Sequence, residues 1–456
     1  MSASNPATGI TVAALAAALA AGRATSRELV EAALARIADP AGEGKRVFLR
    51  VYAENARAAA DAQDRLRQVG YVASPLAGLP VSIKDLFDVA GETTLAGSRA
   101  LDDAPPAARD APVVARLRAA GAVLIGRTNM TEFAFSGVGI NPHHGTPGNP
   151  YDRRRIPGGS SSGAPVSLVD GMAAVAIGTD TGGSVRIPAA LCGTVGFKPT
   201  QKRVPRDGAT PLSTTLDSIG PLGLSVGCCA CADAVLAGEP PVPPPEAAVA
   251  GLRLGVPRTV VLDDLDGDVA DAFERALSTL SHAGARLTDL PLAELGEYAA
   301  INAKGGFSHS EAYAWHAGLI ARRGAEYDPR VRQRIERGRE MSAADYIRLG
   351  WQRADFIARV EARTAEFDAL VTPTLPLVAP EIAAFARDED FWRLNARLLR
   401  NPSLVNFLDR CALTLPIHPP GTAPVGLMLV GRHGEDRRLL SLALGIEAAI
   451  EADRWR

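Results

Sequence analysis

The sequence predicts an α/β protein in which helices cover both faces of a β-sheet. Between residues 163 and 200, helix-like segments alternate with short apolar runs, which is the pattern of such folds. Elsewhere, Ala122–Gly126 and Ala369–Thr372 are apolar runs with the length of buried strands. The chain has 456 residues, of which 47% are hydrophobic, so it can bury a sizeable core.

The first half of the chain shows helical periodicity broken by short strand signals. Thr25 or Ser26 is a suitable cap for the second helix, because Glu28 and Glu31 follow in its first turn. The expected helices are 11–38 (as a pair), 53–68, 110–121, 163–170 and 185–191, and the expected strands are 79–83, 122–126, 173–178 and 194–198.

The second half begins with a predicted loop, Pro199–Pro221, and contains the strongest linker signal, the proline-rich run Glu239–Glu246. A mostly helical excursion then occupies 293–366. The other expected elements are strands at 252–256, 369–372, 413–416 and 425–430 and helices at 267–284 and 434–452.

Charge and hydropathy argue against several classes of partner. The formal net charge is −2, which favours neither nucleic acid nor an anionic membrane. No apolar stretch reaches the length of a membrane span. The Ala-rich run Val12–Ala21 lacks the preceding basic region of a signal peptide. A cytoplasmic protein is therefore expected.

Neither the cysteines nor the histidines have the spacing of a metal site. Cys228, Cys229 and Cys231 cluster without a second pair, which favours small core residues in a reducing compartment. The seven histidines are scattered, and none forms an HxxxH pair. We therefore expect no metal.

Two Gly-Gly-Ser turns carry the strongest chemical signal. Ser160 and Ser184 end these turns, 24 residues apart. Glycine lets a backbone approach a ligand closely, and successive N–H groups at a helix start can bind a developing oxyanion. The alternatives are a phosphate-binding loop or a plain turn. Gly178–Ser184 matches neither GxxxxGK[ST] nor GxGxxG, which disfavours nucleotides.

A serine nucleophile needs a base, and Lys84 is the candidate. No histidine lies nearby in the sequence and no GxSxG elbow is present, which excludes the α/β-hydrolase interpretation. Lys84 ends the apolar strand at 79–83, where burial would lower its pKa and let it act as a base. Ser160 could relay a proton between Ser184 and Lys84. The alternatives are a surface lysine and a flexible linker around Ser160.

Together these segments resemble the amidase signature family of serine hydrolases, which use a Ser–cis-Ser–Lys triad. The resemblance covers most of the chain, is strongest from 79 to 222, and is weakest in 293–366. The segments that carry it are Val81–Asp85, Gly126–Phe133, 158–163 (GGSSSG), 178–188 (GTDTGGSVRIP), 192–200 (CGTVGFKPT), Leu216–Pro221 and Val425–Gly431.

The resemblance implies a large mixed β-sheet between helices in a single domain, 1–456, and a role for each matching position. It makes Ser184 the nucleophile, Ser160 the bridging serine after a cis peptide bond, and Lys84 the ultimate base and acid. The implied mechanism requires no metal and no organic cofactor. The implied oxyanion donors are the amides of Thr181, Gly182, Gly183 and Ser184, and the implied supporting residues are Ser161, Thr179, Asp180 and Arg186, with Arg186 pairing with Asp180.

Specificity is expected to reside in residues 129–145 and in the excursion 293–366. Residues aligned with an acyl pocket in the family are Met130, Phe135, Ser136 and Gly137. His143 and His144, further along the same loop, are interpreted as structural. The excursion is expected to cover the mouth of the site, and its aromatic candidates are Phe307, His309, Tyr313 and Trp315, each of which could instead be ordinary helix packing.

Two functions follow from the resemblance. The first is a free hydrolase, a monomer or homodimer, that cleaves a small amide, or an ester or carbamate with the same carbonyl geometry. The second is a glutaminase subunit of a tRNA-dependent amidotransferase, which would meet tRNA only through a partner. A non-catalytic binding protein is disfavoured because Lys84, Ser160 and Ser184 are all present.

Overall fold

The chain is organised around one mixed sheet of eleven strands, as seen in a computed structural model that describes residues 11–454. The strand order is β1-β3-β2-β4-β6-β5-β10-β11-β9-β7-β8. Strands β2, β3 and β4 run parallel to one another, as do β7, β8 and β9, whereas the strands between these two groups pair antiparallel. The predicted large mixed sheet is confirmed, and the ends of the predicted domain lie outside the described residues.

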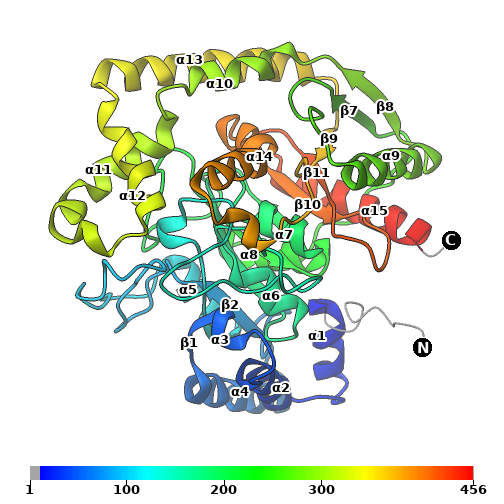
Figure 1. Ribbon diagram of the computed structural model, residues 1–456. Helices are drawn as coiled ribbons and strands as arrows, with labels where there is room; N and C mark the ends of the chain where they lie inside the picture. Colours follow the sequence, from blue (N-terminus) through cyan, green and yellow to red (C-terminus); the bar gives the residue numbers. More distant parts are fainter. Residues whose placement is uncertain (1–10, 455–456) are drawn as a thin grey trace.

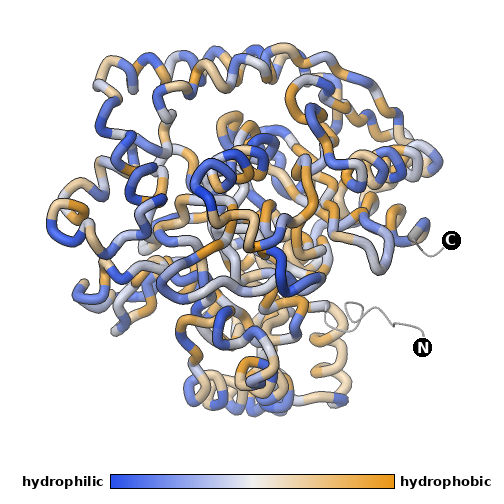
Figure 2. Tube along the Cα trace, in the orientation of Figure 1, coloured by the Kyte–Doolittle hydropathy of each residue, from blue (hydrophilic) through white to orange (hydrophobic). Residues whose placement is uncertain are grey.

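Helices cover both faces of the sheet (Figure 1). Side chains alternate along each strand, so neighbouring residues enter different cores. On β11, Leu427 and Leu429 pack under α9 and α15, whereas Met428 and Val430 join the cluster beneath α13 and α14. Figure 2 shows hydrophobic segments in the middle of the molecule and hydrophilic ones in the outer helices.

The elements have the following bounds. The strands are β1 Phe48–Val51, β2 Pro80–Lys84, β3 Val123–Thr128, β4 Val175–Asp180, β5 Val195–Lys198, β6 Ser218–Gly223, β7 Arg253–Pro257, β8 Arg286–Leu290, β9 Ala369–Pro373, β10 Ala412–Pro416 and β11 Gly426–Val430. The α-helices are α1 Val12–Ala20, α2 Ser26–Ala38, α3 Gly44–Val47, α4 Ala53–Gln68, α5 Pro112–Ala119, α6 Gly163–Val169, α7 Arg186–Cys192, α8 Val226–Ala237, α9 Gly267–His282, α10 Tyr298–Ile301, α11 Gly306–Arg323, α12 Pro329–Glu336, α13 Ala343–Thr364, α14 Asp388–Phe407 and α15 Asp436–Arg454.

Most predicted elements form, including the helical excursion, and Thr25 caps α2 in a capping box with Glu28. The predicted loop Pro199–Pro221 is wrong at its end, because β6 begins at Ser218 and joins β4 to β5. Gly220 weakens the sequence signal of this strand, because glycine is uncommon in strand interiors. A Cβ at this position would lie 2.0 Å from the Phe197 carbonyl oxygen, so close strand packing requires the glycine. The sequence analysis predicted no strand where β8 lies and no helix where α14 lies.

The sheet brings the two chemically distinctive segments together. β2 and β4 are parallel neighbours, with Ile83 opposite Ile177. Their carboxyl ends therefore meet at one edge, which is where open α/β sheets bind ligands. Lys84 ends β2 and Asp180 ends β4, so the lysine and the second Gly-Gly-Ser turn become neighbours although about a hundred residues separate them.

No helix among residues 11–454 is long and apolar enough to cross a membrane.

Candidate active site

Lys84 lies fully buried at the centre of the site. Its Nζ donates to Ser160 Oγ at 2.7 Å and to Thr179 Oγ1 at 2.8 Å. Burial lowers its pKa to about 7, although the charges of Asp217 and Asp180 act in the opposite direction. Within the described residues, no carboxylate forms an ion pair with this ammonium group. The lysine can therefore lose its proton near neutral pH.

Ser160 and Ser184 come from separate turns that are joined by the backbone. The Gly159–Ser160 peptide bond is cis, and Ser160 lies just before α6. The Ser161 amide donates to the Ser184 carbonyl at 3.3 Å, which ties the first turn to the second. Ser160 is fully buried, whereas Ser184 is 4% exposed and lines a cavity. Ser160 therefore contacts the buried lysine, whereas Ser184 lies at the cavity.

The second turn presents backbone amides beside Ser184. The amides of Thr181, Gly182 and Ser184 donate to no other described residue, so these donors are available to a ligand. The Gly183 amide differs from the expectation, because it donates to Asp180 Oδ1 at 2.8 Å. Gly183 has a φ of +123° and a Cβ there would lie 2.5 Å from Pro402, so this position requires glycine. Its contribution is to shape the turn.

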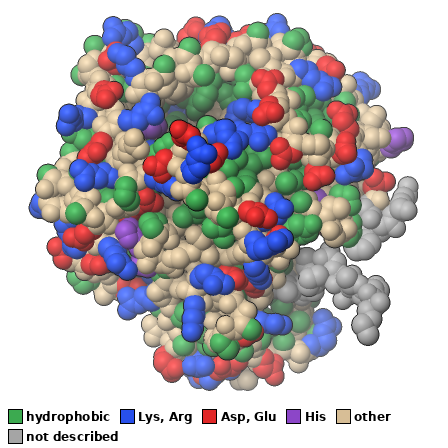
Figure 3. Space-filling model, in the orientation of Figure 1, with side chains coloured by type: hydrophobic (Ala, Val, Ile, Leu, Met, Phe, Trp, Pro, Cys, Tyr) green, Lys and Arg blue, Asp and Glu red, His purple; other side chains and the backbone are tan. Residues whose placement is uncertain are grey.

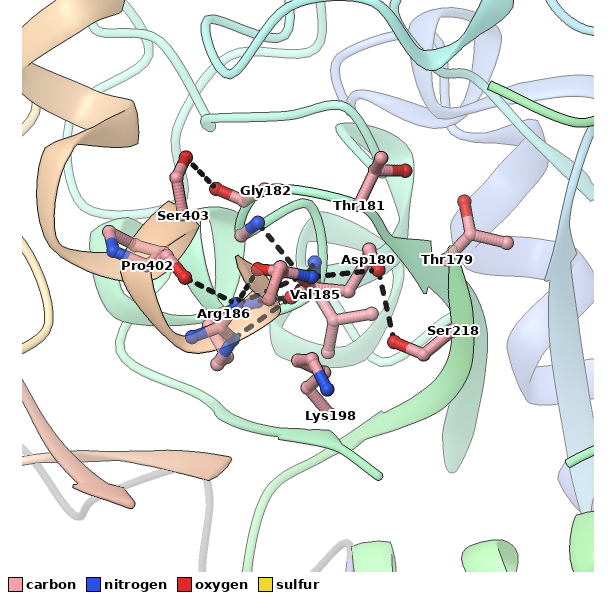
Figure 4. A network of polar contacts seen from close by, with 12 residues as sticks. Thr179, Asp180, Thr181, Gly182, Val185, Arg186, Lys198, Ser218, Pro402 and Ser403 are labelled. Carbon is pink, nitrogen blue, oxygen red and sulfur yellow. Dashed lines mark hydrogen bonds and ion pairs between the residues drawn. The ribbon is translucent and has the colours of Figure 1, made fainter. Parts of the chain in front are cut away.

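A buried ion pair holds this turn in place (Figure 4). Arg186 makes two hydrogen bonds to the Asp180 carboxylate, at 2.9 and 3.0 Å, and both side chains are fully buried. Asn406 of α14 donates to the same carboxylate at 2.9 Å and accepts from Arg186 at 2.6 Å. Burial alone would raise the pKa of Asp180, but the charge and hydrogen bonds of Arg186 outweigh it and hold the pKa below its usual range.

A second carboxylate, Asp217, supports the turn from the segment before β6. Thr181 Oγ1 donates to Asp217 Oδ1 at 2.6 Å, and the amides of Leu212 and Ser213 donate to the same carboxylate. Burial raises the pKa of Asp217 to about 6, although these hydrogen bonds oppose the rise. Asp217 is thus ionised near neutral pH and favours the protonated form of Lys84.

A cavity of about 300 Å³ opens in front of Ser184. Its wall includes the second Gly-Gly-Ser turn and the loop after β3. Residues of α12 and α14 and of the first turn of α11 complete the wall. The lining residues are Ala134, Phe135, Ser136, Thr181, Gly182, Ser184, Leu212, Leu216, Tyr298, Asn302, Gly305, Phe307, Ser308, His309, Arg334, Arg337, Ala396, Leu399, Arg400 and Ser403. This volume suits a small organic molecule.

The predicted pocket residues divide into two groups. Phe135 and Ser136 line the cavity, whereas Met130 and Gly137 do not. Met130 is fully buried, and the Gly137 amide donates to Asn395 Oδ1 at 2.9 Å. These two residues hold the loop that carries Phe135, because hydrogen bonds of their backbones fix its course.

The remaining predicted residues also separate by position. From the excursion, Phe307 and His309 line the cavity, but Tyr313 and Trp315 do not. His143 lies outside the lining and contacts Glu132 at 2.9 Å. His144 also lies outside the lining.

The lysine is oriented by Thr179. The Thr179 side chain accepts a hydrogen bond from Lys84 Nζ, whereas the Ser161 hydroxyl donates to the Thr179 carbonyl at 3.5 Å. Ser161 therefore acts on the strand end that carries Thr179, and its amide ties the two turns together.

Sequence reasoning missed several residues that shape the site. Asn406, Arg400 and Ser403 lie on α14, a helix that the sequence did not predict. Asp217 lies within the family-like segment Leu216–Pro221, so its sequence signal was present, but its contact with Thr181 depends on the pairing of β4 with β6.

Among residues 11–454, no cluster of His, Cys, Asp and Glu has the geometry to hold a metal ion.

Comparison with known proteins gives consistent matches over nearly the whole chain. The family model described as Amidase matches residues 28–440. A 2-amino-5-chloromuconic acid deaminase of Comamonas testosteroni is 42% identical over 407 residues, covering 87% of this chain and 86% of that protein. The A-type subunit of a glutamyl-tRNA(Gln) amidotransferase from Roseiflexus sp. (strain RS-1) is 36% identical over 465 residues, covering 93% of each.

The fold comparison agrees with the sequence comparison. A solved crystal structure of an amidase matches with a TM-score of 0.86 and 34% identity, covering 96% of this chain and 99% of that chain. The fold and the relatives together define a hydrolase of the amidase class. The chain belongs to the amidase signature family.

The buried ion pair predicts a large effect on stability. Arg186→Met should lower the free energy of unfolding by about 3–5 kcal/mol, because it leaves the Asp180 carboxylate buried without its partner. Urea denaturation monitored by circular dichroism measures this change. Arg359→Met, which removes partly exposed ion pairs with Glu297 and Asp355, is the matched control and should have a much smaller effect. Equal effects of the two substitutions would contradict the structural role of the pair.

Proposed function

We propose that the protein is an amidohydrolase that cleaves the C–N bond of a small carboxylic amide through an acyl-enzyme on Ser184. The observation that carries this proposal is Lys84, which is fully buried, has a pKa of about 7 and donates to Ser160 at 2.7 Å. A lysine of this kind can act as a general base at neutral pH. Esters and carbamates present the same carbonyl geometry and are further candidates.

Acylation begins when neutral Lys84 accepts the proton of Ser160 while Ser160 takes the proton of Ser184. The Ser184 Oγ then forms a bond to the substrate carbonyl carbon, and the carbonyl oxygen takes the negative charge. The free amides of Thr181, Gly182 and Ser184 stabilise this oxyanion, and one such donor contributes about 3 kcal/mol in related chemistry. The C–N bond breaks as the proton returns through Ser160 to the leaving nitrogen.

Deacylation repeats the sequence with water as the nucleophile. Lys84 and Ser160 remove a proton from the water, whose oxygen bonds to the acyl carbon. The tetrahedral intermediate collapses, the bond to Ser184 Oγ breaks, and the hydroxyl regains its proton. The products are a carboxylic acid and the released amine or ammonia. These steps use only side chains and backbone amides of the chain.

Removing either end of the relay should abolish turnover. Ser184→Ala and Lys84→Ala should each lower kcat by about a thousandfold or more, because the nucleophile and its base act as a unit. Release of amine or ammonia from a panel of small amides measures this loss. Ser278→Ala, a change on the exposed face of α9, should retain the activity of the parent protein. Near-normal turnover by Ser184→Ala would exclude it as the nucleophile.

The acid limb of the pH profile should follow deprotonation of Lys84. Only the neutral amine can accept a proton, so kcat/KM should rise with pH through about 7. Asp217→Asn should move this limb to lower pH, because the Asp217 charge raises the pKa of the lysine.

The matched control for this shift is Asp233→Asn. It changes a buried acid on α8 that accepts a hydrogen bond from Arg203 and is not among the charges that act on Lys84, so it should leave the limb in place. A profile that stays flat from about pH 5 to about pH 9 would contradict a lysine base.

The second candidate is a glutaminase subunit that passes ammonia to a partner. It is favoured by the 36% identity to the A-type amidotransferase subunit of Roseiflexus sp. over 93% of both chains. Ammonia release from L-glutamine, measured for the purified chain alone and with the other amidotransferase subunits, separates the two functions. The free hydrolase should act on small amides by itself. Glutamine turnover that requires the added subunits, with no turnover of small amides alone, would favour the second candidate instead.

A further inference from the structure

The cavity in front of Ser184 carries positive charge without any negative charge. Three arginines, Arg334, Arg337 and Arg400, line it, and no Asp or Glu of the described residues does. The remaining titratable groups of the wall are Tyr298 and His309. Burial lowers the pKa of His309 to about 3, with the charges of Arg334 and Arg337 acting in the same direction, so His309 is neutral. The cavity thus has a net positive charge.

None of these three arginines forms an ion pair within residues 11–454, unlike their neighbours on the same helices. On α12, Arg332 pairs with Glu336 at 2.9 Å, and on α14, Arg397 pairs with Asp266 at 3.0 Å. By contrast, Nη1 of Arg334 is buried with no hydrogen-bond partner, as are Nη2 of Arg400 and, despite its ion pair, Nε of Arg397. Buried guanidinium nitrogens normally have acceptors, so Arg334 and Arg400 at the cavity lack a group that a ligand can supply.

Arg334 is also held in a fixed position at the wall. Its guanidinium lies over the ring of Phe135, 4.5 Å from the centroid, and His309 packs against the same ring with centroids 5.1 Å apart. A planar guanidinium held in this way can form two parallel hydrogen bonds to a carboxylate with little further loss of side-chain freedom. Arg400 is anchored by a hydrogen bond from its Nε to Asn401 Oδ1 at 3.1 Å.

The first turn of α11 adds donors of a different kind. Gly305, Phe307 and Ser308 line the cavity, and the helix has no side-chain cap. The amides of Gly306, Phe307 and Ser308 donate to no described residue. The amino end of an 18-residue helix therefore lies at the cavity that the arginines line, and such ends favour anions.

The wall also carries apolar side chains, beside the polar side chains of Ser136, Asn302, Ser308 and Ser403. Leu212, Leu216 and Leu399 lie in the lining together with Phe307, and the cavity volume is about 300 Å³. A ligand that fits has a short hydrocarbon segment and at least one anionic end. Figure 3 shows positive and negative side chains mixed over the visible face, so the charge of the cavity is not part of a broad basic surface there.

We propose that the substrate is a monoamide of a small dicarboxylic acid, whose free carboxylate binds Arg334 while its amide carbonyl meets Ser184. Arg337, which is exposed, and Arg400 on α14 are the further cationic contacts, and the first turn of α11 supplies amide donors. This inference rests on the proposed amidohydrolase function for the choice of an amide. The anion site itself rests only on the unpaired arginines and the helix end.

The test compares charged and neutral amides of matched length. The parent protein is assayed with malonamate, succinamate, glutaramate and adipamate, and with propanamide, butyramide, pentanamide and hexanamide. Arg334→Met should lower kcat/KM for the preferred monoamide about tenfold to a hundredfold, since it removes a charged hydrogen bond. It should change kcat/KM for the neutral amides less than about threefold. Arg332→Met, on the same helix but already paired, is the control and should change neither.

Binding without turnover provides an independent measurement. Ser184→Ala is titrated by calorimetry with malonate, succinate, glutarate and adipate, and the same titrations are made with Ser184→Ala combined with Arg334→Met. At least one dicarboxylate should bind, and the added substitution should weaken it about tenfold or more. Arg337→Met, at an exposed position, tests the same site without threatening the fold. Circular dichroism verifies that each variant is folded.

The outcomes separate the two proposals. Dicarboxylate binding that depends on Arg334, with no amide turned over, would retain the anion site and overturn the amidohydrolase function. Turnover of neutral amides as fast as monoamides, or equal losses for both classes in Arg334→Met, would overturn the anionic substrate while leaving the hydrolase. Failure of every dicarboxylate to bind would also overturn the proposal of an anionic substrate.

Discussion

The site depends on a single buried carboxylate, Asp180. Two charges removed from water are costly, and the cost is offset here because Arg186 and Asn406 saturate the Asp180 oxygens with hydrogen bonds. The same carboxylate accepts the amides of Gly183 and Val185, which turns the chain sharply after β4. The ion pair therefore joins a strand end, a short helix and α14. Ser184 and the free amides are held by this junction.

Lys84 shows the opposite response to the same kind of environment. Asp180 stays charged because a guanidinium contacts it, whereas Lys84 is surrounded by hydroxyls and has no carboxylate in contact. Its pKa falls to about 7 because burial penalises the ammonium form, and the more distant Asp217 limits the fall. Two ionisable groups in one buried region thus keep different protonation states, a common arrangement in acid–base sites.

Much of the fold could be predicted because its elements follow local patterns. The strand that ends at Lys84 and the helix 53–68 were recognisable from apolar runs and helical periodicity. β6 was missed because Gly220 and Pro221 lower strand propensity, which tertiary packing overrides. Helix α14 was also missed. Asn406 and Arg400 could not be assigned to the site without it, since nothing in their local sequence indicates that they reach the turn.

The sequence by itself determined which reactive groups the chain carries: two serines after Gly-Gly pairs, an aspartate and arginine six residues apart, and a lysine at the end of an apolar run. Tertiary structure alone decided which of them meet. The parallel pairing of β2 with β4 brings Lys84 to Thr179, and burial there decides its protonation. Likewise, Arg334 and Arg400 are ordinary helix residues in sequence. They become an unpaired cationic wall because α12 and α14 place them at one cavity without acidic partners.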